Sequence, residues 1–144
     1  MNITIRPATI DDAATVVDLV QQLADTSTDS SPLDSDYARK YIESGQGRIL
    51  IAESDRRPVG MLSYFLRPNL YHAGQSCFID ELVVAREHRG EGIGSALMAG
   101  LIEIAEAEHC AEITVCVDSA NDPAKKLYNR FGLVNEGVLL ERHY

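Results

Sequence analysis

An apolar run that leads into a glycine-rich helix start is the feature that most constrains this chain. Residues 83–95 read VVAREHRGEGIGS, with glycines at three alternating positions. Glycine lets the backbone adopt positive φ and approach a ligand closely. The first turn of a helix leaves its N–H groups without intrahelical acceptors, at the positive end of the helix dipole. The segment therefore predicts a strand–turn–helix unit that holds an anion such as a pyrophosphate, with Arg89 adding positive charge.

Two better-known phosphate loops do not fit this segment. The P-loop requires a lysine before its Ser or Thr, whereas Ser95 directly follows Gly94. The dinucleotide-binding fingerprint GxGxxG requires its third glycine one residue later than Gly94. A turn that only lets the chain enter a helix is the simpler alternative. Three alternating glycines after an arginine are more than such a turn requires.

Hydrophobic periodicity predicts a single mixed α/β (α+β) domain over residues 1–144. The chain has 144 residues, enough for one buried core and too few for two ordinary domains. Strands are expected where apolar residues alternate or run together, and helices where they recur every three or four residues. The expected strands are 2–6, 48–53, 58–67, 75–85, 111–117 and one or two within 133–143, and the expected helices are 10–25, 33–42, 92–109 and 121–131.

Composition excludes several classes of function. Thirteen Lys+Arg against twenty-two Asp+Glu give a net charge of −9, which argues against nucleic-acid or anionic-membrane partners and suits cationic or neutral small molecules. The sequence has neither an apolar signal segment nor a membrane span, so a cytoplasmic protein is expected. Three cysteines without CxxC spacing and four scattered histidines predict no metal site.

Around the glycine-rich segment the sequence resembles the GNAT N-acetyltransferase superfamily. The family signature is an apolar strand followed by Arg/Gln-x-x-Gly-x-Gly/Ala at a helix start, and residues 89–94 match it at every position. The resemblance implies three layers, with a mostly antiparallel mixed sheet of six to seven strands flanked by about four helices. It also implies acetyl-CoA as the co-substrate. The residues it assigns to the coenzyme are Leu82, Val83 and Val84 through their backbone, and Arg89, Gly90, Glu91, Gly92, Ile93, Gly94 and Ser95 in the pyrophosphate turn.

A second match lies in residues 121–132, NDPAKKLYNRFG, which resemble the family's Asn-x-x-Ala-x-x-x-Tyr-x-x-x-Gly helix. Asn121, Ala124 and Tyr128 follow one another at one-turn intervals and share a helix face. In the family this face contacts the coenzyme, and the tyrosine protonates the leaving thiolate. The alternative is that Tyr128 is an ordinary core residue with a locally bonded hydroxyl.

Asp80 and Glu81 interrupt an otherwise apolar strand and are the candidate general bases. Adjacent strand residues point to opposite faces, so at least one acid must lie on a covered face. A carboxylate there needs a partner or has a raised pKa, as active-site acids often do. The alternative is a structural ion pair with Arg6 or Arg67. The sequence leaves the choice between the two acids open.

These matches predict an N-acetyltransferase that moves the acetyl group of acetyl-CoA to a primary amine of a small molecule, by direct attack in a ternary complex. Cys77 and Cys116 occur in apolar strands and give no support for a covalent acyl-enzyme. A protein N-terminal or lysine N-acetyltransferase and a non-catalytic acetyl-CoA sensor are the alternatives.

The resemblance places the amine acceptor among residues 22–44, 67–76 and 136–144. The first segment is acidic and suits a cationic acceptor, unless it is only a solvated loop. Arg67 in the second suits an acceptor with an anionic group, as a looser likeness to aminoalkylphosphonate acetyltransferases implies. An edge strand near the C-terminus commonly pairs chains in this family, so the resemblance also allows a homodimer.

Overall fold

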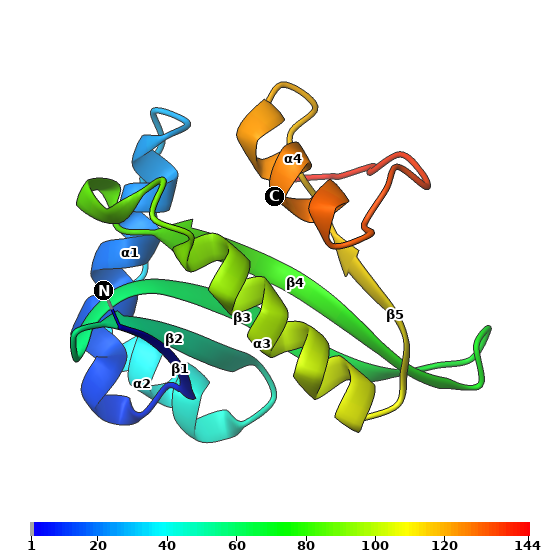
Figure 1. The fold of residues 1–144 in the computed structure, drawn as a ribbon, viewed down its shortest axis with the longest axis horizontal. Helices are drawn as coiled ribbons and strands as arrows, with labels where there is room; N and C mark the ends of the chain where they lie inside the picture. The colour runs from blue at the N-terminus through cyan, green and yellow to red at the C-terminus, as the bar shows by residue number, and fades with distance from the viewer. Residues whose placement is uncertain (1) are drawn as a thin grey trace.

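The computed structural model describes residues 2–144 and has a mixed sheet with helices on both faces (Figure 1). The chain pairs β1 through β4 as antiparallel neighbours and adds β5 parallel to β4. The strands are β1 (Ile3–Pro7), β2 (Arg48–Ser54), β3 (Arg57–Asn69), β4 (Gly74–Val84) and β5 (Cys110–Val115), in that spatial order. The helices are α1 (Ala13–Asp25), α2 (Ser35–Ser44), α3 (Ile93–Ala107) and α4 (Asp122–Arg130).

The two faces of the sheet bury separate apolar clusters, because side chains alternate along each strand. Ile51 and Met61 pack on one face with Val16 of α1. Leu62 packs on the other face with Leu97 of α3, in a cluster that α4 also joins. The predicted mixed α/β class with layers of helices on both sides of a sheet is confirmed.

The predicted count of six to seven strands is wrong, because residues 2–144 contain five. The missing strands were predicted within residues 133–143, which form neither helix nor strand. Val138 and Leu140 in this segment are each 88% exposed. Leu133 packs on the cluster beneath α3, but the apolar side chains that follow it are exposed and gain too little to hold a strand conformation.

A partly buried ion-pair cluster connects β1 and β2 to the turn before α1. Arg6 donates two hydrogen bonds to Asp12, at 2.8 and 2.9 Å, and its Nε lies 3.0 Å from Glu53. Asp12 is 5% exposed and also accepts a hydrogen bond from the Thr9 N–H at 2.7 Å. The Arg6 guanidinium holds the pKa of Asp12 below its ordinary value. Because Arg6 is engaged here, the alternative in which it pairs with the acids of β4 is wrong.

Replacing Asp12 with Asn should lower the free energy of unfolding by about 2 kcal/mol at pH 7, because Arg6 loses a charged acceptor. The lowered pKa of Asp12 stabilises the fold above the ordinary value of 3.8, and this contribution is lost as the pH falls through the lower folded-state value. Urea denaturation should therefore show a smaller difference at pH 3 than at pH 7.

The control is Asp11→Asn, at an exposed neighbouring position, which should change stability by less than about 0.5 kcal/mol. A difference between wild type and Asp12→Asn that is the same at both pH values would contradict the assignment.

Candidate active site

β4 and β5 separate part-way along their length and open a gap in the sheet. Their ladder begins at Gln75–Cys110 and ends at Ile79–Val115. β4 continues to Val84 paired with β3 alone, so within residues 2–144 no strand pairs with its other edge over residues 80–84. In Figure 1 β5 diverges from β4 and leads toward α4. A strand edge of this kind can bind an extended ligand through backbone hydrogen bonds.

The glycine-rich turn lies beyond the end of β4 and begins α3. Gly90 and Gly92 have φ of +80° and +84°, and a Cβ at either position would meet open space. Backbone conformation, not packing, therefore requires glycine at both positions. The first hydrogen bond of α3 runs from the Ala96 N–H to the Gly92 carbonyl at 3.1 Å, which leaves the N–H groups of residues 93–95 without intrahelical acceptors. This geometry fits a phosphate-bearing ligand such as coenzyme A.

Two arginines border this turn. The Arg89 Nε donates to the Val84 carbonyl at 3.2 Å, and Arg130 donates to the Ser95 hydroxyl at 3.1 Å. Glu91 is engaged locally, with its carboxylate 3.1 Å from His88 Nδ1. Sequence reasoning identified Arg89 and missed Arg130, because only the packing of α4 against α3 brings Arg130 to the turn.

α4 holds Tyr128 beside the gap. The Asn121 side chain accepts a hydrogen bond from the Ala124 N–H at 3.2 Å and so caps the helix start. Gly132, at φ +85°, ends the helix, and the Leu133 N–H then bonds the Tyr128 carbonyl at 3.0 Å. Of the three residues predicted to share a face, Ala124 and Tyr128 join the core cluster, whereas Asn121 is exposed.

Tyr128 is almost completely enclosed. It is 7% exposed and lines a groove of about 1150 Å³ that runs between β5, α4 and the C-terminal segment. Burial raises the pKa of its hydroxyl to about 12. A neutral phenol therefore faces the groove over the whole physiological pH range.

A β-bulge places the two candidate acids, Asp80 and Glu81, in different environments. Ser63 pairs with Glu81 and the next residue, Tyr64, pairs with Ile79, so Asp80 is the extra residue on β4. Asp80 is exposed, whereas Glu81 is partly buried on the face that α1 and α2 cover. Only tertiary structure could distinguish them, because the bulge depends on the register with β3.

Ser63 holds the Glu81 carboxylate. The Ser63 hydroxyl donates to this carboxylate and accepts a hydrogen bond from the Glu81 N–H at 3.0 Å. Burial raises the pKa of Glu81, the Ser63 hydrogen bond opposes that rise, and the nearby charge of Asp80 adds to it. Partial burial also raises the pKa of Asp80. Neither acid forms an ion pair with Arg67, whose guanidinium lies 6.0 Å from the centre of the Phe65 ring.

Tyr41 of α2 is a further residue that sequence reasoning missed. Its pKa is raised to about 12, mainly by burial and further by the negative charges of Glu81 and Asp80. No local motif marks Tyr41, because it reaches the acids only through the packing of α2 on the sheet.

The structure holds the tip of the segment 67–76 away from this site. Residues 67–76 form the β3–β4 hairpin, whose tip lies at the end of β4 opposite the glycine-rich turn. Gly74 and Glu81 lie about 23 Å apart along the strand at about 3.3 Å per residue.

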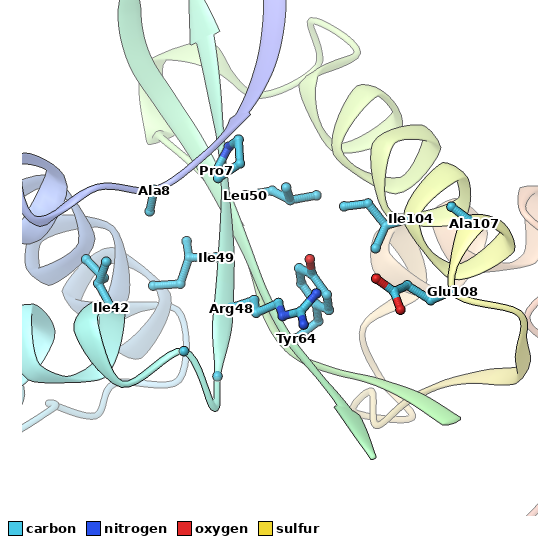
Figure 2. Close-up of a pocket in the computed structure, with 12 residues that line it drawn as sticks. Pro7, Ala8, Ile42, Arg48, Ile49, Leu50, Tyr64, Ile104, Ala107 and Glu108 are labelled. Carbon is cyan, nitrogen blue, oxygen red and sulfur yellow. The ribbon is translucent and has the colours of Figure 1, made fainter. Parts of the chain in front are cut away.

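A separate pocket of about 400 Å³ lies near the end of β1 and the start of β2 (Figure 2). Arg48, Tyr64 and Glu108 face one another across it, with Ile49 and Ile104 among its apolar walls. Glu108 follows the last turn of α3, whereas the glycine-rich turn precedes its first. None of the predicted site residues lines this pocket.

The fold and the anion-binding geometry of the β4–α3 turn agree with the result of sequence comparison, which gives the class of protein. The model of the acetyltransferase (GNAT) family matches residues 17–133, and the chain belongs to this family. The protein is an N-acetyltransferase-type enzyme, and enzymes of this family use acetyl-CoA as co-substrate.

The chain is similar to characterised acetyltransferases along nearly its whole length. It is 27% identical to phosphinothricin N-acetyltransferase from Streptomyces viridochromogenes over 147 aligned positions, which cover 99% of this chain and 80% of that protein. The fold also matches a ribosomal-protein-alanine N-acetyltransferase from Brucella melitensis biovar Abortus 2308, with a TM-score of 0.85, 20% identity and 99% of both chains covered. An aminoglycoside acetyltransferase from an uncultured soil metagenomic sample matches with a TM-score of 0.83 and 24% identity, over 100% of this chain and 99% of that one.

Residues 2–144 lack two features. No helix in this range is long and apolar enough to cross a membrane. The same range contains no group of three or more His, Cys, Asp or Glu side chains arranged to hold a metal ion.

Replacing Ser63 with Ala should raise the pKa of Glu81 further, because the hydrogen bond that stabilises its charged form is lost. Carbon-13 NMR titration of the Glu81 carboxyl group measures this directly. In the wild-type protein, Glu81 should titrate above its ordinary value of 4.5.

Ser54→Ala is the matched control, since Ser54 is a buried serine of β2 that makes no hydrogen bond to Glu81. The interpretation fails if Ser63→Ala lowers the pKa of Glu81 or if both variants shift it equally.

Proposed function

We propose that this protein transfers the acetyl group of acetyl-CoA to a primary amine of a small molecule, by direct attack of the amine on the thioester. The gap between β4 and β5 is the observation that carries the proposal. Glu81 lies on the α1–α2 face of the sheet beside this gap, and Tyr128 belongs to the cluster on the α3–α4 face. A base for the amine and a donor for the leaving sulfur thus approach one opening from opposite sides.

Glu81 is the proposed general base. A lysine-like amine has a pKa of about 10.4, so removing its proton at pH 7 costs roughly 4.6 kcal/mol. The raised pKa of Glu81 makes it a stronger base than an ordinary carboxylate, and the Ser63 hydrogen bond fixes its position. The exposed Asp80 adds a second negative charge that attracts a protonated amine.

Tyr128 is the proposed donor to the leaving sulfur. A phenol with a pKa of about 12 facing a thiol with a pKa near 8.5 makes complete proton transfer uphill by about 5 kcal/mol. The hydroxyl therefore stabilises the developing thiolate through a hydrogen bond, and any proton transfer accompanies departure of the sulfur.

The coenzyme is proposed to lie along the free edge of β4 and against the glycine-rich turn. When bound, acetyl-CoA supplies an activated acetyl thioester. The backbone of residues 82–84 would hold the extended arm, and the N–H groups of residues 93–95, with Arg89, would hold the pyrophosphate. Asn121 and Ala124 begin α4 on the other side of the gap.

A covalent acyl-enzyme on Cys77 is disfavoured. The prediction that Cys116 lies in an apolar strand is wrong, because Cys116 follows β5 and is exposed. Cys77 is fully buried, and burial raises the pKa of its thiol to about 12. A buried thiol with so little thiolate is a poor nucleophile.

The small-molecule class is supported by the similarity to phosphinothricin N-acetyltransferase, whose name identifies a small acceptor. A thiol-release assay with acetyl-CoA and a panel of primary amines tests the proposal. Turnover of one or more amines is expected. Tight coenzyme binding without turnover of any amine, peptides included, would instead favour the sensor alternative.

Replacing Gly92 with Ala should raise the dissociation constant of coenzyme A by about fivefold, because a Cβ at φ +84° costs about 1 kcal/mol and displaces the start of α3. Isothermal titration calorimetry measures the change. Gly74→Ala is the control, because Gly74 lies in the distant hairpin without positive φ and has room for a Cβ. Equal affinities in the two variants would contradict the assignment of the turn.

Glu81→Gln should lower kcat/KM for the amine by about 100-fold at pH 7, because a general base is lost. In the wild-type enzyme the rate should rise with pH through the raised pKa of Glu81, and this rise should be absent in the variant.

Tyr128→Phe should lower kcat by roughly 10- to 100-fold and leave coenzyme affinity nearly unchanged.

Steady-state kinetics over a range of pH check both variants, with Tyr71→Phe as the control for loss of an exposed hydroxyl. If kcat is undiminished in Tyr128→Phe, Tyr128 is not the donor to the leaving sulfur. If the rate of Glu81→Gln still rises with pH as in the wild-type enzyme, Glu81 is not the general base.

A further inference from the structure

Two phenylalanines extend the site along the face of the sheet that carries Glu81. Phe65 of β3 and Phe78 of β4 are register partners, and their rings stack with centroids 5.3 Å apart and planes inclined by 22°. Phe65 lies two residues beyond Ser63, so alternation places both on the same face of β3. We call Phe65 and Phe78 the aromatic shelf.

The aromatic shelf lies outside both buried clusters. The cluster beneath α1 and α2 includes Met61 and Val83 of β3 and β4, and neither phenylalanine belongs to it or to the cluster beneath α3. In Figure 1 the β3–β4 hairpin continues well past α1 and α2. Phe65 and Phe78 are each partly exposed. Phe78 also lines the large groove that Tyr128 lines. The stacked rings are thus partly exposed beside the proposed reaction centre.

The spacing between Glu81 and the aromatic shelf defines a ligand length. The Ser63–Glu81 pair and the Phe65–Phe78 pair are two residues apart on β3, or about 6.6 Å at 3.3 Å per residue. An amine joined to an aromatic ring through two or three carbons spans about this distance, given bonds of about 1.5 Å. Arg67 covers the far end of the shelf, with its guanidinium 6.0 Å from the centre of the Phe65 ring.

The charges near the aromatic shelf favour one orientation of such an amine, with its nitrogen at Glu81 and its ring on the shelf. Glu81 and Asp80 attract a protonated amine to one end, whereas Arg67 repels it from the other. An aromatic ring gains offset or edge-to-face contacts with phenylalanine beyond its apolar burial. An alkyl chain of similar size gains only the burial.

On the basis of the proposed function, we infer that the acceptor is an arylalkylamine, with its primary amine at Glu81 and its ring on the aromatic shelf. In the reaction the amine nitrogen forms a bond to the acetyl carbon, the carbon–sulfur bond breaks and Glu81 takes the amine proton. The sulfur leaves as the thiolate of coenzyme A, which accepts a hydrogen bond from Tyr128 and takes up a proton from solvent, and Glu81 returns its own proton to solvent. No further reactant is required.

Equilibrium binding to the protein saturated with coenzyme A tests the inference without turnover. Isothermal titration calorimetry should show that 2-phenylethylamine binds on the order of tenfold more tightly than n-hexylamine. Phe78→Leu and Phe65→Leu should each remove most of this preference. Tyr71→Leu is the matched control, because Tyr71 is a 93% exposed aromatic residue at the tip of the same hairpin, and it should retain the preference.

Equal affinity of the wild-type protein for the two amines overturns the inference, even if both phenylalanine variants fail to fold. A preference that persists in folded Phe78→Leu and Phe65→Leu also overturns it. Turnover distinguishes this failure from failure of the proposed function. If 2-phenylethylamine binds preferentially but no amine is acetylated, the aromatic shelf binds the ring as inferred and the proposed function is wrong. If amines are acetylated but 2-phenylethylamine has no preference in binding, only the role of the aromatic shelf is wrong.

Discussion

The end of the β4–β5 ladder is the constraint on which the rest of the site depends. Paired strands satisfy each other's backbone groups, and the parallel ladder stops at Ile79–Val115 while β4 continues to Val84. If the ladder continued, the edge of β4 would have no free groups for a ligand. Because it stops, the edge of β4 over residues 80–84 is free for a ligand. α4 holds Tyr128 beside this opening, and the start of α3 lies just beyond the same end of β4.

The electrostatics of the site differ from those of the whole chain. The net charge is −9, yet the strongest predicted binding element is a turn of backbone N–H groups bordered by Arg89 and Arg130. An anion responds to the local field at such a turn, so the net charge says little about the coenzyme. The excess of acid bears on the other reactant, through Glu81 and Asp80.

The glycine-rich turn and α4 were predictable because their sequence signals are local. Positive φ requires glycine at residues 90 and 92, and Asn121 and Gly132 mark the two ends of α4. The C-terminal strands were not predictable in this way, because a strand needs a partner as well as an apolar pattern. Within residues 133–143 Leu133 packs on the cluster beneath α3, whereas Val134, Val138, Leu139 and Leu140 are exposed.

The sequence by itself determined the order of the elements as far as α4, the family and the chemical groups available to the site. These follow from short-range sterics and from hydrophobic periodicity, which are local properties of each segment of the sequence. Only tertiary structure decided that Glu81 and not Asp80 lies against Ser63, and that Arg130 reaches Ser95. The physical reason is that the face of a strand residue depends on its register with the neighbouring strand, and a bulge of one residue reverses it.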